Sequence, residues 1–141
     1  MLKILVAVDG SDNSERAVEY LLKLVAALKD TQIHLINVQD PVNALETTQC
    51  WTAEQCAALQ QEAGDLALTA ARKLLDLAGI PYTAEIAAGA VAQTIVDYAR
   101  EWQCDMIVMG TRGMSAVGNL LLGSVAHKVV HLADVPVTLV R

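Results

Sequence analysis

Three glycines and a serine near the C-terminus have the spacing Gly-x2-Gly-x9-Gly-Ser and are well suited to bind an anion. Gly110 and Gly113 follow an apolar segment that predicts a strand, and Gly123 and Ser124 begin a predicted helix. A helix N-terminus leaves backbone N–H groups without acceptors and carries a partial positive charge, so it favours phosphate. Glycine lets the backbone approach such a ligand without a Cβ in the way. The spacing therefore predicts a phosphate-binding loop between a strand and a helix.

Two better-known phosphate-binding motifs do not fit this segment. Gly113 and Gly118 have the glycine spacing of a P-loop, but Asn119 and Leu120 stand where that motif has Lys and Ser or Thr. No Gly-x-Gly-x-x-Gly follows a predicted strand, so the dinucleotide fingerprint is also missing. A single glycine more often only ends a strand or begins a helix. Three of them at one long spacing favour the ligand-binding interpretation.

Neither catalytic residues nor a metal site are predicted. His127 and His131 have the spacing of a metal-ligand pair on a helix, but the residues between them lack the glutamate of a zinc protease helix, and no third ligand is evident. Gly-x-Ser-x-Gly is absent, and Ser115 has no base at a local spacing. His34 lies in an apolar segment, where a core or edge histidine with a satisfied ring is expected. The sequence thus favours binding over turnover.

The composition predicts one globular domain, residues 1–141, with an aliphatic core. The hydrophobic share is 54% and the charged share 18%, which excludes a disordered chain. No apolar run approaches the roughly 18 to 20 residues that cross a bilayer. The first residues read as a strand and not as a signal peptide. We therefore expect a cytoplasmic protein that does not contact membranes.

The formal net charge of −6 argues against binding to nucleic acid, which needs clustered Lys and Arg, whereas the ten basic residues here are scattered. The same charge repels a free nucleotide, so a phosphate site must depend on backbone amides, one arginine and a metal ion. Cys50, Cys56 and Cys104 do not have the spacing of a disulfide framework or a zinc site. They are expected to be small apolar residues in a reducing compartment.

Hydrophobic periodicity predicts strands that alternate with helices. Turn and N-cap residues precede the first helix, and Thr52 and Gln55 have the spacing of a capping box. The predicted strands are Leu2–Val8, Ile33–Val38, Tyr82–Ala88, Met106–Met109 and Val135–Val140. One predicted helix has its apolar positions between residues 17 and 28 and ends at residues 29–31, and another follows Gly89 with its apolar positions between 91 and 99. The other two predicted helices cover about 52–78 and 124–132, and Gln39–Trp51 is a predicted loop. Such alternation requires crossover connections and a parallel sheet covered on both faces. Asp9, Val38, Gly89 and Gly110 end or follow these strands, so they should converge on one crevice.

The chain resembles the universal stress protein family over nearly its whole length. The resemblance is carried by the opening Ile4-Leu-Val-Ala-Val-Asp9-Gly-Ser, by Cys104-Asp-Met-Ile-Val-Met-Gly-Thr-Arg-Gly113, by Leu122-Gly-Ser-Val-Ala126 and by Val135-Pro-Val137. It implies an α/β three-layer sandwich with a five-stranded parallel sheet of order 3-2-1-4-5, a Rossmann-like nucleotide-binding fold. Family members that keep these glycines bind ATP, so the resemblance implies an adenine nucleotide, ATP or AMP, with Mg²⁺.

Carried over position by position, the resemblance implies nine ligand contacts. Asp9 would accept hydrogen bonds from adenine or ribose, although an ordinary turn-forming aspartate is an equal alternative. The backbone of Val38 would face the adenine ring, which is compatible with simple core packing, and Met109 would line the nucleoside pocket. The other six would contact ribose and phosphates: Gly110, Arg112, Gly113, Gly123, Ser124 and Val125.

The resemblance also implies a homodimer that forms through the C-terminal strand, Val135–Val140, which is apolar and expected at a sheet edge. The leading hypothesis is a dimeric adenine-nucleotide-binding protein of the stress response. Nucleotide would order the loop from Gly110 to Gly123 and so report its level to a regulatory protein partner. Two alternatives remain open at this point: a slow ATPase, and a nucleotide-free interaction module.

Overall fold

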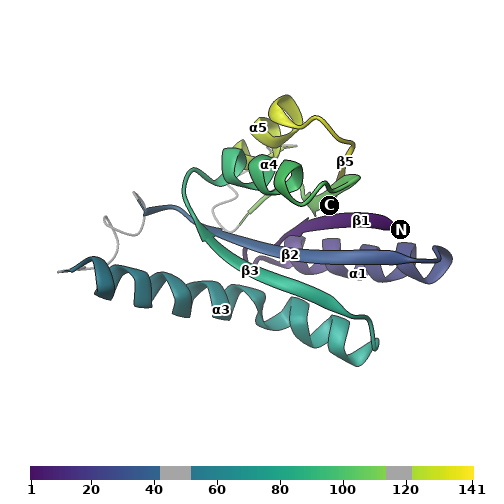
Figure 1. Ribbon diagram of the computed structural model, residues 1–141, viewed down its shortest axis with the longest axis horizontal. Coiled ribbons are helices and arrows are strands. Elements are labelled where there is room, and N and C mark those ends of the chain that lie inside the picture. The colour runs from purple at the N-terminus through teal and green to yellow at the C-terminus, as the bar shows by residue number, and fades with distance from the viewer. Residues whose placement is uncertain (42–51, 114–121) are drawn as a thin grey trace.

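The computed structural model of the chain describes residues 1–41, 52–113 and 122–141, and strands alternate with helices along it. Its five strands form one sheet in which every neighbouring pair is parallel and the order is β3-β2-β1-β4-β5 (Figure 1). The expected α/β fold and strand order are thus confirmed. The elements are β1 (Leu2–Ala7), α1 (Asp12–Ala27), β2 (Thr31–Gln39), α3 (Ala53–Leu77), β3 (Tyr82–Ala88), α4 (Val91–Glu101), β4 (Met106–Gly110), α5 (Ser124–Leu132) and β5 (Val137–Val140).

Helices cover both faces of the sheet, with α1 and α3 on one side and α4 and α5 on the other (Figure 1). Successive side chains of a strand point to opposite faces. Ile4 and Val6 accordingly pack in the core beneath α1 and α3, while Leu5 between them packs in the core beneath α4 and α5. This double burial explains why the strands read as continuous aliphatic runs. Within the described ranges, no helix has both the length and the apolar character that a membrane span requires.

The helices on one face of the sheet begin differently from those on the other face. Ser11 caps α1, where its Oγ accepts from the Ser14 N–H at 3.2 Å, and Thr52 caps α3, where its Oγ1 accepts from the Gln55 N–H at 3.1 Å. By contrast, α4 begins after Ala90 and α5 after Gly123, and neither residue makes a side-chain cap. The predicted N-cap at Thr52 is therefore confirmed, and two helix N-termini are left without one.

Several element boundaries differ from the sequence prediction, each for a local reason. The last strand begins at Val137 and not at Val135, because Pro136 has no N–H to donate to a sheet. The second strand begins at Thr31, two residues before the predicted Ile33. Asp30 turns the chain with a positive φ of 63°, so Thr31 already pairs with Leu2 of β1. Of the predicted loop at Gln39–Trp51, Gln39 ends β2, and residues 42–51 lie outside the described part of the chain.

His34 is buried and its ring has partners, as the sequence predicts. Its Nδ1 contacts the Thr83 hydroxyl, and its ring packs against Trp102 with 4.8 Å between the ring centroids. Burial lowers the pKa of His34 and the nearby charge of Lys3 lowers it further. The ring is therefore a neutral part of the core beneath α4 and not a member of the predicted ligand site.

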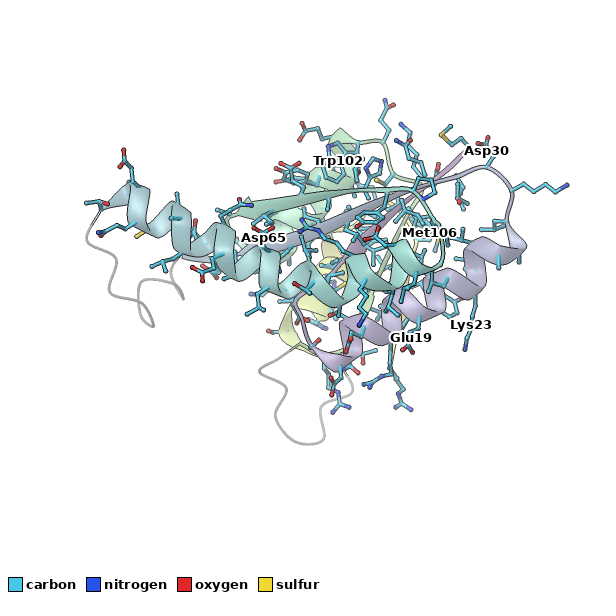
Figure 2. The ribbon with its side chains drawn as sticks, turned by 90° about the horizontal axis from the view of Figure 1, so that it is seen from below. Glu19, Lys23, Asp30, Asp65, Trp102 and Met106 are labelled. Carbon is cyan, nitrogen blue, oxygen red and sulfur yellow. The ribbon has the colours of Figure 1, made fainter. Side chains whose placement is uncertain are left out.

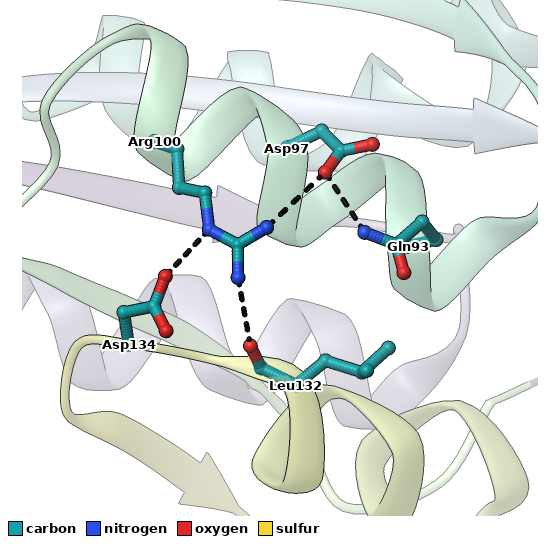
Figure 3. A network of polar contacts seen from close by, with 5 residues as sticks. All are labelled: Gln93, Asp97, Arg100, Leu132 and Asp134. Atoms are coloured by element: carbon teal, nitrogen blue, oxygen red, sulfur yellow. Dashed lines mark hydrogen bonds and ion pairs between the residues drawn. The ribbon is translucent and has the colours of Figure 1, made fainter.

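Arg100 fastens the end of α5 to α4 (Figure 3). Its Nε donates to the Asp134 carboxylate, and a terminal nitrogen donates to the Leu132 carbonyl at 3.4 Å. Another terminal nitrogen lies 3.6 Å from Asp97, which also accepts from Gln93. Because Leu132 is the last residue of α5, this network fixes the C-terminal end of the helix whose first turn was predicted to bind phosphate.

The Arg100 contact predicts a measurable shift in the titration of Asp134. The hydrogen bond and charge of Arg100 hold the pKa of the Asp134 carboxyl below its ordinary value. The interaction therefore stabilises the folded chain at neutral pH, and this stabilisation is lost as the pH falls through the folded-state pKa. In Arg100→Met, the pKa of Asp134 should rise to its ordinary range in an NMR titration. Arg72→Met, which removes a separate ion pair with Asp65, should leave the titration of Asp134 unchanged.

Candidate functional site: a pocket at the carboxyl edge of the sheet

A cavity of about 410 Å³ lies at the carboxyl ends of the central strands. The strand order reverses between β1 and β4, and an open α/β sheet of this kind forms a crevice at that point. The crevice receives residues from the end of each central strand and from the first turns of α4 and α5. The size lies within the range of about 300 to 1,000 Å³ that is usual for small-molecule sites.

All nine residues that the sequence proposes as ligand contacts line this cavity. They come from segments far apart in the chain, so their convergence depends on the fold and not on local spacing. Their roles toward a ligand stay predictions. The nine are Asp9, Val38, Met109, Gly110, Arg112, Gly113, Gly123, Ser124 and Val125.

One half of the cavity is apolar. Ile36 and Val38 contribute from β2 and Met109 from β4, while Val91 and Ile95 close it from the first turns of α4. Ile36 and Ile95 are buried and belong to the core beneath α4 and α5, so this wall is rigid. The sequence analysis missed the contribution of α4, because its apolar side reads only as a core-facing stripe. The wall can accommodate a flat apolar ring.

The other half is polar and is bordered by Asp9 and Gly113. The Asp9 carboxylate is exposed, and one of its oxygens accepts from the Ser11 N–H at 2.9 Å. Its second oxygen lies only 2.6 Å from where a Cβ on Gly113 would be. Glycine at this position thus lets a carboxylate and the loop after β4 approach one another. Both interpretations of Asp9 remain compatible with this geometry, because a turn-forming aspartate can still offer its second oxygen to a ligand.

The first turn of α5 supplies donors, but not all of those expected. The Gly123 N–H donates to the Thr111 carbonyl at 2.6 Å, so the amide that the sequence assigned to phosphate is engaged within the chain. Gly123 instead serves as the N-cap position of α5, where its carbonyl accepts from the His127 N–H at 3.0 Å. The amides of Ser124 and Val125 have no acceptor inside the helix. The Ala126 amide also precedes the first intrahelical bond, so these three amides are the donors of this turn that remain for an anion.

Asn37 is a cavity residue that the sequence analysis did not identify. It is 3% exposed, and its Nδ2 donates to the Val8 carbonyl at 2.8 Å. Its Oδ1 accepts from Gln39 at 2.6 Å. The bond to Val8 ties the end of β2 to the residue that follows β1, and the bond from Gln39 holds the Asn37 side chain in place beside the pocket. The sequence feature that could have identified Asn37 is its polar side chain near the carboxyl end of an otherwise apolar strand.

The histidine pair on α5 lies outside the cavity. His127 and His131 are both exposed, and their rings contact each other with 4.7 Å between centroids. Among the described residues, no group of three or more His, Cys, Asp or Glu side chains is placed to hold a metal ion. Cys104 is buried and Cys56 is half-buried, and both are free thiols, whereas Cys50 lies outside the described residues.

Comparisons with known proteins agree with this architecture. Residues 1–141 match the family model described as the universal stress protein family. Universal stress protein MJ0531 of Methanocaldococcus jannaschii is 33% identical over 141 residues, which are 99% of this chain and 81% of that protein. A solved structure of the hypothetical protein MJ0577 superimposes with a TM-score of 0.84 at 27% identity and covers 99% of this chain and 94% of that chain. A universal stress protein solved in complex with cAMP superimposes with a TM-score of 0.72 at 26% identity, and the match covers 99% of this chain and 97% of that chain.

Gly110 and Gly113 should respond differently to a single methyl group. A Cβ on Gly110 would lie 2.8 Å from Asn13 Cβ and 2.9 Å from its backbone carbon, where neither neighbour can move freely. We expect Gly110→Ala to lower the free energy of unfolding by roughly 1 to 3 kcal/mol, measured by urea denaturation. Gly113→Ala meets only the end of the Asp9 side chain and should cost clearly less. Equal losses in the two variants would contradict this assignment of Gly110 to packing.

Proposed function

The chain belongs to the universal stress protein family, and we propose that it binds an adenine nucleotide, ATP in the first place, in the pocket at the carboxyl edge of its sheet. The observation that supports this most is the division of one cavity into an apolar wall and a polar border that ends at an uncapped helix. A nucleotide has the same division into base and phosphate. The cAMP complex of a family member at 26% identity supports the ligand class.

The base would lie against the apolar wall of the cavity. Val38 and Met109 offer contact area for a planar ring, and the backbone at the end of β2 lies in the same wall. Asp9 lies just after β1 at the border between the two halves, where a carboxylate oxygen can accept a hydrogen bond from a ribose hydroxyl. The ribose would therefore bridge the apolar and polar halves.

The phosphates would lie against the first turn of α5. The amides of Ser124 and Val125 and the Ser124 hydroxyl provide neutral donors, and Arg112 provides charge. A helix N-terminus contributes about 0.3 to 1 kcal/mol toward an exposed negative charge and up to about 2 kcal/mol when partly buried. That is less than ATP affinity requires, so several donors must act together.

Mg²⁺ would enter with the nucleotide and not occupy a preformed protein site. The described residues contain no cluster of three potential metal ligands, but Mg²⁺ usually binds through one or two carboxylates together with substrate phosphates. The second oxygen of Asp9 faces Gly113 in the polar half and fits such a role. The ion would offset the negative charge that the carboxylate presents to the phosphates.

The biological role that we propose is nucleotide sensing in a cytoplasmic stress response, through a regulatory protein partner. Binding is favoured over turnover, because the sequence offers no recognisable pairing of a nucleophile with a base. The free thiols of Cys56 and Cys104 suit a reducing compartment.

The proposed site predicts that a carboxylate at position 113 abolishes tight nucleotide binding. Gly113→Asp would place a second negative charge beside Asp9 and fill the space next to the phosphates. We expect calorimetry with ATP and Mg²⁺ to show at least a tenfold loss of affinity. Ala63→Asp adds the same charge at an exposed position of α3 and should bind like wild type. Equal affinity in all three proteins would rule out the proposed phosphate site.

We also propose that two copies of the chain pair through β5. This strand lies at an edge of the sheet, and its residues are only half-buried although they are apolar apart from Thr138. The carbonyls of Pro136 and Val140 accept from Ile107 of β4 and from Thr111 directly after it, so residues 137 and 139 present their backbone groups to the outer edge. An apolar edge with unpaired backbone groups is a template for pairing with another chain.

The edge-pairing proposal predicts that Leu139→Pro shifts the protein toward the monomer. Proline removes the outward N–H of this residue but leaves the bonds to β4 in place. Leu139→Ala is the matched control, since it shortens the same side chain and keeps the N–H. Sedimentation at micromolar concentration should show wild type and Leu139→Ala as dimers and Leu139→Pro mainly as a monomer. A monomeric wild type would contradict the proposal.

A further inference from the structure

A second cavity, of about 430 Å³, adjoins the nucleotide pocket. It is lined by residues 10–13 before and at the start of α1, by Arg16 of the same helix, and by Arg112 and Gly113. Arg112 and Gly113 line both cavities, so the two meet at the loop that follows β4. Apolar side chains form one wall of the first cavity, whereas the described residues that line the second are all glycine, polar or charged.

The charges in the second cavity favour an anion. Arg16 and Arg112 both line it, and Asp12 is the one carboxylate among its described lining residues. Two guanidinium groups beside one space both attract an anion, and a concave site focuses their combined field. Ser11 already caps the N-terminus of α1, and the positive charge beside the cavity comes from the two arginines.

Arg16 retains donors for such an anion. Its Nε donates to the main-chain oxygen of Arg141 at 2.9 Å, and one terminal nitrogen contacts the Asn13 side-chain oxygen. A guanidinium has five N–H groups, and within the described part of the chain only these two hydrogen bonds are seen for Arg16. The two contacts hold the exposed side chain over the cavity, while its planar shape suits phosphate oxygens.

We propose that the second cavity receives the terminal phosphates of a nucleoside diphosphate or triphosphate, and that Arg16 makes this chain prefer them to a monophosphate. The inference rests on the proposed function, since the nucleoside and its first phosphate occupy the first cavity. Ser124 and Val125 line only the first cavity and would hold that first phosphate. The chain of phosphates then passes Arg112 and Gly113, where the cavities meet, and ends at Arg16.

The test compares AMP, ADP and ATP by calorimetry, each with excess Mg²⁺, in wild type and Arg16→Met. Methionine keeps an unbranched side chain and removes the charge. Loss of a charge-assisted hydrogen bond should weaken ATP binding by about tenfold or more and leave AMP binding within about twofold. Arg16→Lys, which keeps the charge but not the planar donors, should lie between the two. Thermal unfolding of each variant shows whether the fold is retained.

Lys23→Met is the matched control. Lys23 extends from the outer face of α1, two turns beyond Arg16, and lines neither cavity (Figure 2). The Lys23→Met variant loses the same charge as Arg16→Met, so it measures the general effect of net charge on nucleotide affinity. If Lys23→Met weakens ATP as much as Arg16→Met does, the specific role of Arg16 is overturned. The same holds if Arg16→Met weakens AMP and ATP equally.

The outcomes also separate this inference from the proposed function. If wild type binds AMP and ATP equally well, the second cavity is not a phosphate site, while nucleotide binding stands. If wild type binds none of the three nucleotides, both proposals fail. Tripolyphosphate without a nucleoside should bind wild type more weakly than ATP, and more weakly still in Arg16→Met. Tripolyphosphate that binds as tightly as ATP would identify a free polyphosphate as the occupant and overturn the nucleotide assignment.

Discussion

The main chain of Thr111 is hydrogen-bonded on both sides, and the pocket depends on these two bonds. Its N–H donates to the Val140 carbonyl at 2.9 Å, and its carbonyl accepts from the Gly123 N–H at 2.6 Å. Thr111 is buried, so leaving either group unpaired would be costly. The bonds place the ends of β4 and β5 and the start of α5 at fixed distances. Without them, nothing in the local sequence would hold the first turn of α5 beside the strand ends.

The polarity of each of the two cavities follows from the elements that border it. The first lies between the central strands and the helices of one face, so buried aliphatic side chains supply its wall. The second lies at the start of α1, where the chain turns and the described lining residues do not include a core side chain. An amphipathic ligand is thus oriented by burial of its apolar end, and charge acts on its other end.

Much of the fold could be predicted from sequence, because alternating apolar strands and amphipathic helices leave few arrangements. The parallel sheet follows from alternation alone, whereas its order came from the family resemblance. Gly110 shows the limit of a motif: the sequence assigns it to a ligand, but the structure also shows it in close contact with Asn13. Asn37 and the amide of Gly123 show the same limit. Their partners are distant in the chain, and spacing carries no information about them.

The missing caps of α4 and α5 have a consequence for heat resistance. Where Ser, Thr, Asp or Asn would stand in a protein selected only for stability, this chain has Ala90 and Gly123. Alanine at such a position forgoes about 0.5 to 2 kcal/mol and glycine a few tenths. A serine at position 90 would raise the melting temperature of the empty protein, whereas one at position 123 would compete with a bound phosphate for the first N–H groups of α5. Stability of the empty protein and ligand binding are therefore opposed at the start of α5.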